Sequence, residues 1–241
     1  MTGGKAKIEK NLQAIRQNVT EACARAGRDP REVMLLAVTK DADLEAVKTV
    51  LDLGLTDLGE SQVQQLTDRA PQLAAYLARR RPELADKVRW HMIGHLQRNK
   101  VKLALEATRI IHSVDSLRLA EAIHDRADRL ERVVDVLLEV NCSLEPQKHG
   151  MAVGAAIHLA ELVCSLKGLR LVGLMTMAPL VDDPEKARAT FVRLRELFED
   201  LQHEKIAPDS FRHLSMGMSQ DYPVAVEEGA TILRIGTALF Q

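Results

Sequence analysis

The chain has 241 residues, 46% of them hydrophobic and 28% charged, which is the composition of an ordinary globular protein. A net charge of -1 offers no field for nucleic acid or an anionic membrane, and 3% aromatic residues are too few for a base-stacking surface. The sequence has no apolar run that could span a membrane, and its first residues lack the apolar core of a signal peptide. Three widely spaced cysteines outside any CxxC pair favour reduced thiols, and we therefore expect a cytoplasmic protein.

Apolar strands alternate with amphipathic helical stretches along almost the whole chain. An opening helix is expected over residues 5–26. Eight strands are expected to follow, at residues 33–39, 56–59, 88–93, 109–114, 133–141, 171–177, 211–216 and 231–236. This alternation predicts an α/β fold, a single (β/α)8 TIM barrel over residues 1–241 with an extra N-terminal helix. An open doubly wound sheet is the alternative, but its glycine-rich dinucleotide fingerprint and its P-loop are both missing.

The first expected strand is apolar at nearly every position and ends at Lys40. Strands apolar on both faces belong to parallel sheets covered by helices, where an unpaired lysine is costly. One interpretation is covalent chemistry, because a desolvated amine can form a Schiff base with an aldehyde such as pyridoxal phosphate. The other is a strand-end lysine whose ammonium group reaches water. This strand alone favours the second interpretation, and the rest of the chain favours the first.

Unusual polar residues gather where the expected strands end. In a (β/α)8 barrel the C-terminal ends of the strands carry the chemistry. The residues at this end are Lys40, Glu60, His91, Asp115, Asn141, Thr176, Ser215 and Arg234. The sequence therefore predicts a functional site at this end of the barrel.

Two short loops follow the seventh and eighth expected strands, and both contain glycine and hydroxyl side chains. Barrels frequently bind phosphate with these two loops, because glycine lets the backbone approach the anion and successive N–H groups bind it. The candidate hydroxyl donors are Ser215, Ser219 and Thr237. Ser219 also has a simpler role open to it, as the N-cap of a helix over about residues 220–228.

Arg234 lies two residues before Gly236, so the two share one face of the eighth strand. If Gly236 meets a phosphate, Arg234 faces the ring of the same ligand and would donate a hydrogen bond to a pyridine nitrogen. A nitrogen held in this way stays unprotonated, which makes the ring a poorer electron sink. The alternative is an arginine that pairs with a carboxylate such as Glu60.

His91 and His95 are four residues apart, a spacing that suggests zinc only when both lie on one helix. Here the end of a strand and Gly94 separate them, so we expect no metal site. A phosphate-sugar barrel enzyme would need a pair of carboxylates, for which Glu60 and Asp115 are available. Lys40 argues against that class.

Several segments together resemble the pyridoxal phosphate homeostasis proteins (the YggS/PROSC type), in the family's order and across essentially the whole chain. They are Ala-Val-Thr-Lys at 37–40, Trp-His-Met-Ile-Gly-His-Leu-Gln-Arg-Asn-Lys at 90–100, His-Ser-Val-Asp at 112–115, Leu-Ser-Met-Gly-Met-Ser at 214–219 and Arg-Ile-Gly-Thr-Ala-Leu-Phe at 234–240. The resemblance implies a barrel like the N-terminal domain of alanine racemase, with pyridoxal 5'-phosphate (PLP) held as a Schiff base on Lys40. The cofactor-binding residues it implies are Lys40, Ser61, His91, Ser215, Met216, Gly217, Ser219, Arg234, Gly236 and Thr237.

The resemblance also implies a role in vitamin B6 homeostasis. Members of this family are regarded as carriers or regulators of PLP without established turnover, so we expect no catalytic residues. We also expect a monomer, and PLP-dependent apoenzymes as the acceptors of its PLP. One segment departs from the family, which usually has Gly-Glu-Asn-Tyr after the second strand, whereas this chain has Gly-Glu-Ser-Gln at 59–62. Ser61 has a shorter reach than the usual Asn, which weakens the expected contact on that side of the ring.

A PLP-dependent amino-acid racemase is the alternative function. A two-base racemase needs a second acid or base opposite the lysine. In alanine racemases this group is a tyrosine from a separate C-terminal β domain, and this chain ends soon after the eighth strand. Its two tyrosines are Tyr76, on an expected outer helix, and Tyr222, beyond the phosphate loop, and neither is an obvious replacement. We therefore expect a carrier rather than an enzyme.

Overall fold

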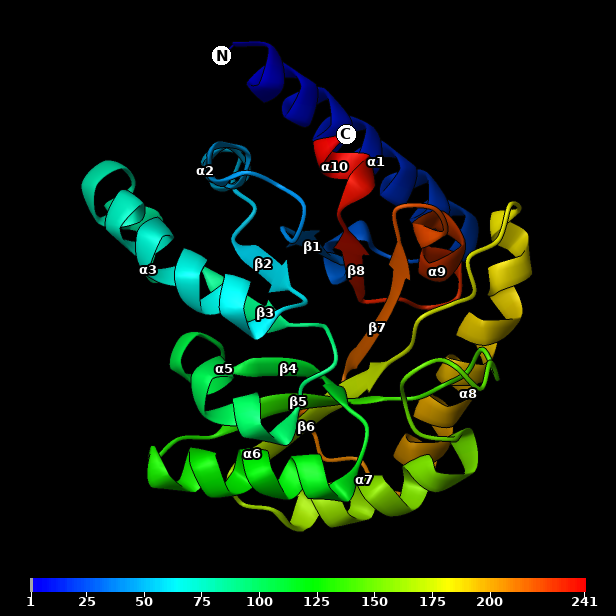
Figure 1. Cartoon of the computed structure of the whole chain (residues 1–241). Coiled ribbons are helices and arrows are strands. Elements are labelled where there is room, and N and C mark those ends of the chain that lie inside the picture. Colours follow the sequence, from blue (N-terminus) through cyan, green and yellow to red (C-terminus); the bar gives the residue numbers. More distant parts are fainter. Residues whose placement is uncertain (1) are drawn as a thin grey trace.

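Eight parallel strands close into a barrel in which each strand pairs with its neighbour in the sequence (Figure 1). The computed structural model describes residues 2–241. The strands are β1 (Met34–Val38), β2 (Asp57–Glu60), β3 (Arg89–Met92), β4 (Ile110–Val114), β5 (Val134–Glu139), β6 (Leu169–Met175), β7 (His213–Met218) and β8 (Ile232–Ile235). Ile232 of β8 pairs with Met34 of β1, which closes the ring. The predicted (β/α)8 barrel is therefore confirmed.

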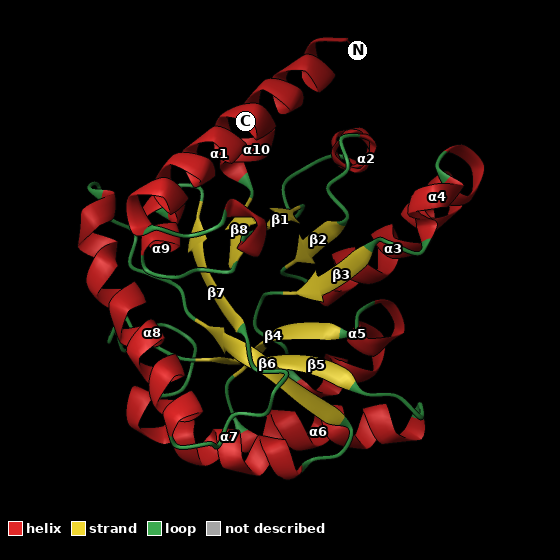
Figure 2. Cartoon of the chain, turned by 180° about the vertical axis from the view of Figure 1, so that it is seen from behind, coloured by secondary structure: helices red, strands yellow, loops and turns green. Residues whose placement is uncertain are grey.

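Helices cover the outside of the barrel, as Figure 2 shows. They are α1 (Thr2–Ala26), α2 (Leu44–Asp52), α3 (Val63–Arg80), α4 (Pro82–Ala85), α5 (Val101–Ala107), α6 (Leu117–Arg129), α7 (Ala156–Ser165), α8 (Arg188–His203), α9 (Tyr222–Glu227) and α10 (Thr237–Phe240). Their apolar faces and the outer faces of the strands form one large core. No helix within residues 2–241 is long and apolar enough to cross a membrane.

The extra N-terminal helix is α1, and it packs against α9 and α10, which follow β7 and β8 (Figure 1). Its buried side chains recur at helical spacing, at Ile8, Leu12, Ile15 and Val19. The side-chain amide of Asn11 donates a hydrogen bond to the backbone oxygen of Leu239 at 3.1 Å. α1 therefore supports the two loops that the sequence assigns to phosphate binding.

Five strands end one or two residues earlier than the sequence predicts, and two of them matter for the site. β1 stops at Val38, so Lys40 lies in the turn that follows it, and β5 stops at Glu139, two residues before the predicted end. Beyond Glu139, a single parallel bridge between Val140 and Met151 continues the pairing. We call the end formed by the C-terminal ends of the strands the mouth of the barrel, and the opposite end its floor.

The interior of the barrel is only partly apolar. Leu137, Val172 and Met175 form a small buried cluster that is separate from the core beneath the helices. Buried polar side chains on the strands or directly after them include Glu139, His91, His112, Thr176, Ser215 and Arg234. Because buried polar groups need hydrogen-bond partners, the contacts of these side chains largely determine the structure of the site.

Candidate functional site

Lys40 lies at the mouth of the barrel, in the turn after β1. Its side chain is 53% exposed, and its Nζ lies 3.9 Å from Oδ2 of Asp41. The expectation that Lys40 closes a strand buried on both faces is wrong, because β1 ends at Val38 and Lys40 is half exposed in the turn that follows. Its place at the end of the first strand, rather than burial, now supports a covalent role.

Arg69 of α3 holds the turn that carries Lys40. It donates hydrogen bonds to the backbone oxygens of Thr39 and of Ala42, the latter at 2.7 Å, and pairs with Glu60 at 2.6 Å. Thr39 Oγ1 donates to the same carboxylate oxygen at 2.6 Å. Burial raises the pKa of Glu60, and Thr39 and Arg69 act against that rise. The backbone on both sides of Lys40 is therefore fixed to a buried ion pair.

Arg234 of β8 is buried, and its contacts are to uncharged oxygens. Its Nη1 donates to the backbone oxygen and to Oγ of Ser215, both at 2.7 Å, and its Nη2 donates to the backbone oxygen of Thr176 at 2.8 Å. Within residues 2–241 no carboxylate lies within ion-pair distance, so the alternative of a pair with Glu60 is wrong. Burial lowers the pKa of Arg234 to about 10, which leaves the group charged at neutral pH.

A chain of hydrogen bonds crosses the interior from Arg234 to the floor of the barrel. Oγ of Ser215 lies 2.9 Å from Nδ1 of His112, and Nε2 of His112 lies 2.9 Å from Nδ1 of His91. Nε2 of His91 lies 3.1 Å from Oδ1 of Asp57, which opens β2. We call these five residues the interior chain.

The charges along the interior chain determine the direction of its hydrogen bonds. Burial lowers the pKa of His91 and of His112, so both rings are neutral at neutral pH. Burial opposes the charge of Asp57, but hydrogen bonds from His91 and Arg89 outweigh it and hold the pKa of this carboxyl below its usual value. The carboxylate of Asp57 therefore accepts a hydrogen bond from Nε2 of His91. Nδ1 of His91 in turn accepts from Nε2 of His112, and Nδ1 of His112 accepts from the hydroxyl of Ser215. Every donor points from the mouth toward the floor.

Four of the predicted cofactor-binding residues have buried side chains engaged within the protein. His91, Ser215 and Arg234 belong to the interior chain, and Met216, which follows Ser215 in β7, packs its side chain into the core beneath the helices. A cofactor contact from these residues stays a prediction. For Met216 such a contact can come only from its backbone.

The two loops predicted to bind phosphate lie side by side at the mouth. The backbone N–H of Ala238 donates to Oγ of Ser219 at 3.1 Å, which joins the loop after β7 to the loop after β8. Gly236 is half-buried and the neighbouring Thr237 is exposed. The structure therefore brings the loops of Ser219 and Thr237 together, whereas the hydroxyl of Ser215, the third candidate donor, lies against His112 in the interior.

Glycine is required within the first of these loops. Gly217 has a φ of +90°, and a Cβ there would come within 2.6 Å of Cβ of Ala225. Asp221 occupies the N-cap position of α9, so the alternative role of Ser219 as the cap of that helix is wrong. The carboxylate of Asp221 instead accepts a hydrogen bond from the backbone N–H of Met218 at 2.6 Å. The hydroxyl hydrogen of Ser219 remains available to a ligand.

The loops after β2 and β3 are also in close contact. Ser61 is half-buried, and a Cβ at Gly94 would come within 2.2 Å of the Ser61 backbone oxygen. His91 and His95 are separated as expected, because His91 faces the interior and the His95 side chain is 40% exposed at the mouth. The Ser61 hydroxyl has no hydrogen-bond partner in the described part of the chain, so it too can meet a ligand.

Glu139, the last residue of β5, is a residue of the site that the sequence analysis missed. It is buried, and its Oε2 has no hydrogen-bond partner among the described residues. Burial and then the charge of Asp115 raise its pKa to about 7, against the effect of Arg234. Such a carboxyl group can take up or release a proton near neutral pH. Its signal in the sequence is a charged residue in an otherwise apolar strand end, two positions after Leu137.

Two hollows of about 410 Å³ lie away from the mouth. One lies between α1 and the floor, with Arg16, Leu55 and Asp57 in its lining, and the other lies between α3 and β3, with Leu73 and Trp90 in its lining. Neither contains a predicted cofactor-binding residue. The strand ends, rather than these hollows, therefore define the candidate site.

The sequence and the barrel fold of this chain are similar to those of known proteins. The family model described as alanine racemase, N-terminal domain, matches residues 10–241. The pyridoxal phosphate homeostasis protein of Aquifex aeolicus (strain VF5) is 39% identical over 231 residues, which cover 96% of each chain. The chain belongs to the pyridoxal phosphate homeostasis protein family.

Solved structures agree with this assignment. The crystal structure of an unknown protein from Bifidobacterium adolescentis has a TM-score of 0.91 and 34% identity, and the match covers 100% of this chain and 97% of that one. PipY of Synechococcus elongatus PCC7942, solved with PLP bound, has a TM-score of 0.80 and 32% identity, and the match covers 97% of this chain and 100% of PipY. The fold therefore extends over essentially the full length of both relatives.

Proposed function

We propose that this chain binds PLP at the mouth of its barrel, as a Schiff base on Lys40, and serves vitamin B6 homeostasis without catalytic turnover. The observation that carries the proposal is the full-length match to PipY with PLP bound, combined with a lysine directly after β1. The proposal includes a cytoplasmic monomer that passes PLP to apoenzymes as acceptors.

The side chains at the mouth fit the two ends of this cofactor. The loops after β7 and β8 offer backbone N–H groups and the hydroxyls of Ser219 and Thr237 to a phosphate. Arg234 is a buried cation without a counterion, and its Nε makes no hydrogen bond to a described residue. Because a guanidinium has only donors, a ring nitrogen facing it must accept and stay unprotonated. The bound cofactor supplies an electron sink, which an unprotonated ring weakens.

The test of cofactor binding is an absorption spectrum of the protein mixed with PLP, before and after borohydride. We expect a visible band that borohydride removes, because it reduces a Schiff base to a stable secondary amine. Peptide mass spectrometry should then find the adduct on the peptide that contains Lys40. A protein that stays colourless with PLP, or an adduct on a different lysine, would contradict the proposal.

A PLP-dependent racemase is a second candidate, and Glu139 is the observation that favours it. Neither tyrosine can supply the second base, because Tyr76 of α3 donates to Asp52 of α2 and Tyr222 accepts from Asn18 of α1. Burial raises the pKa of Glu139 to about 7, and this carboxyl group lies at the same end of the barrel as Lys40. Its carboxyl group is buried beside the mouth, where a substrate proton would have to be exchanged.

Deuterium incorporation at the alpha carbon of amino acids in heavy water distinguishes the two candidates. We expect exchange no faster than with free PLP, because the contacts of Arg234 leave the ring a weak electron sink. The control is Glu139→Gln, which keeps the shape of the side chain and removes its titration. Exchange at enzyme-like rates that Glu139→Gln abolishes, with the opposite enantiomer as product, would establish the racemase instead.

A further inference from the structure

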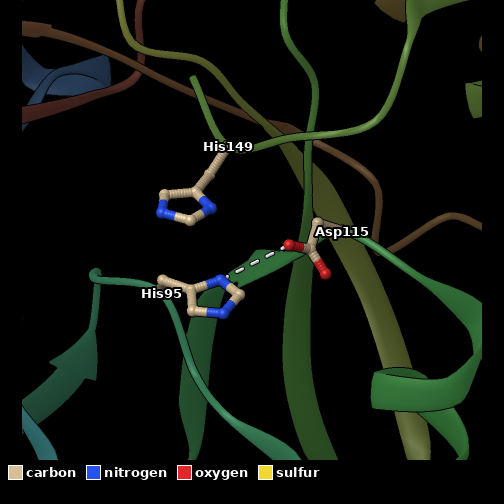
Figure 3. Close-up of side chains that lie close together, drawn as sticks. All are labelled: His95, Asp115 and His149. Carbon is tan, nitrogen blue, oxygen red and sulfur yellow. Dashed lines mark ion pairs between the residues drawn. The ribbon is translucent and has the colours of Figure 1, made fainter. Parts of the chain in front are cut away.

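Three side chains that the proposed function does not use converge at the mouth, as Figure 3 shows. His95 follows β3, Asp115 follows β4, and His149 lies in the loop after β5. One potential ligand atom from each of the three lies within 4.8 Å of the other two. The fold therefore collects two imidazoles and one carboxylate from separate loops at one point.

The contacts within this cluster leave its ligand atoms unused. Nδ1 of His95 lies 3.5 Å from Oδ2 of Asp115, and the rings of His95 and His149 stack with centroids 4.3 Å apart (Figure 3). The hydroxyl of Ser116 donates to the other oxygen of Asp115 at 3.1 Å. In the described part of the chain, neither imidazole makes a hydrogen bond. The ring nitrogens of His95 and His149 and the second carboxylate oxygen of Asp115 therefore lie near one another at the mouth without other hydrogen-bond partners among the described residues.

The chemistry of these atoms matches a particular class of ligand. Two imidazole nitrogens and one carboxylate oxygen are ligands of Zn²⁺ and neighbouring transition metals, with open positions left for water. Bonds of about 2.1 Å place tetrahedral ligands about 3.4 Å apart, close to the separation of His95 and Asp115. The third atom has to approach by at most about 1.4 Å, a movement that rotation of the exposed rings of His95 and His149 can supply.

We propose that His95, Asp115 and His149 bind one divalent transition-metal ion, such as Zn²⁺, at the mouth of the barrel. The site joins the loops after β3, β4 and β5, whereas the proposed phosphate loops follow β7 and β8. It uses none of the residues assigned to PLP. The proposal therefore stands or falls independently of the proposed function.

The test is isothermal titration calorimetry of the full-length, chelator-treated chain with Zn²⁺, after removal of any affinity tag. We expect one ion per chain. Because loss of an outer-shell partner already costs about 10- to 100-fold in metal affinity, His95→Ala and His149→Ala should each weaken binding by more than about 100-fold. Asp115→Asn should also weaken it. Titration with Co²⁺ adds a spectroscopic readout, namely d–d bands without a thiolate charge-transfer band.

The matched control is His158→Ala. Nδ1 of His158 also lies 3.5 Å from a carboxylate oxygen, that of Glu161, but this exposed pair has no second imidazole beside it. The control variant should bind Zn²⁺ as the wild type does. Absence of a binding isotherm, or one that His95→Ala and His149→Ala leave unchanged while circular dichroism shows folded protein, would overturn the proposal.

Discussion

Replacement of Lys40 by alanine is expected to abolish the visible absorption band and the borohydride-fixed adduct. The variant keeps both phosphate loops and Arg234, so PLP should still bind without a covalent link. A single charge-assisted hydrogen bond is worth about 1.5–3 kcal/mol, so loss of a covalent link should cost more than about 100-fold in affinity. Spectral titration and equilibrium dialysis with PLP measure the two effects separately.

Lys148→Ala is the matched control for this experiment. Lys148 precedes His149 in the loop after β5, so it lies at the same end of the barrel, where it pairs with Glu145 at 2.5 Å. This variant should keep both the band and the adduct. If Lys40→Ala retains the band and Lys148→Ala loses it, the covalent link has been assigned to the wrong lysine.

The largest loss of stability is expected from Arg69→Met. This change leaves the buried carboxylate of Glu60 without its ion-pair partner and removes two hydrogen bonds to the turn that carries Lys40. Removal of one partner of a buried pair typically costs about 3–5 kcal/mol in the free energy of unfolding. Urea denaturation followed by circular dichroism measures the change. Arg79→Met, an exposed position near the end of the same helix, should stay within about 0.5 kcal/mol of the wild type.

The pH dependence of Arg69→Met provides a second check. Burial already raises the pKa of Glu60, and loss of Arg69 removes an interaction that opposes the rise. The folded variant then binds a proton at Glu60 more tightly than the unfolded chain does. The loss of stability is therefore complete above the folded-state pKa and shrinks as pH falls toward the unfolded value of about 4.3. An equal loss at about pH 8 and about pH 5 would contradict this account of the pair.

The barrel could be predicted because each strand is a short apolar run followed by an amphipathic helix, and both patterns are local. The end of β1 could be predicted to within one residue, because polar residues follow Val38, but the path of the turn that carries Lys40 could not. The turn is held by Arg69, thirty residues later, whose guanidinium binds the backbone oxygen of Thr39.

The candidate site was predictable to the extent that its residues follow strands. The joined loops after β7 and β8 follow from the fold alone once eight strands are recognised. The interior chain could not be predicted, because Ser215 and His112 are 103 residues apart and meet only when the barrel closes. From the sequence alone Ser215 is a candidate phosphate donor, because the period of a strand indicates which face a residue lies on and not which partner it meets.

Asp57 and Arg234 are the two ends of the interior chain, and they carry unlike groups. Asp57 has a carboxylate that can only accept hydrogen bonds, and Arg234 has a guanidinium that can only donate them. This arrangement gives the two imidazoles a single pair of tautomers. If a substitution placed a neutral hydrogen-bond donor at position 57, the proton of each imidazole could move to the other ring nitrogen. His112 would then donate to Ser215, and the hydroxyl hydrogen of Ser215 would be free to turn away from the interior. A substitution at the floor, made only to strengthen the barrel, would thus alter a hydrogen-bond donor next to Arg234 without touching any ligand.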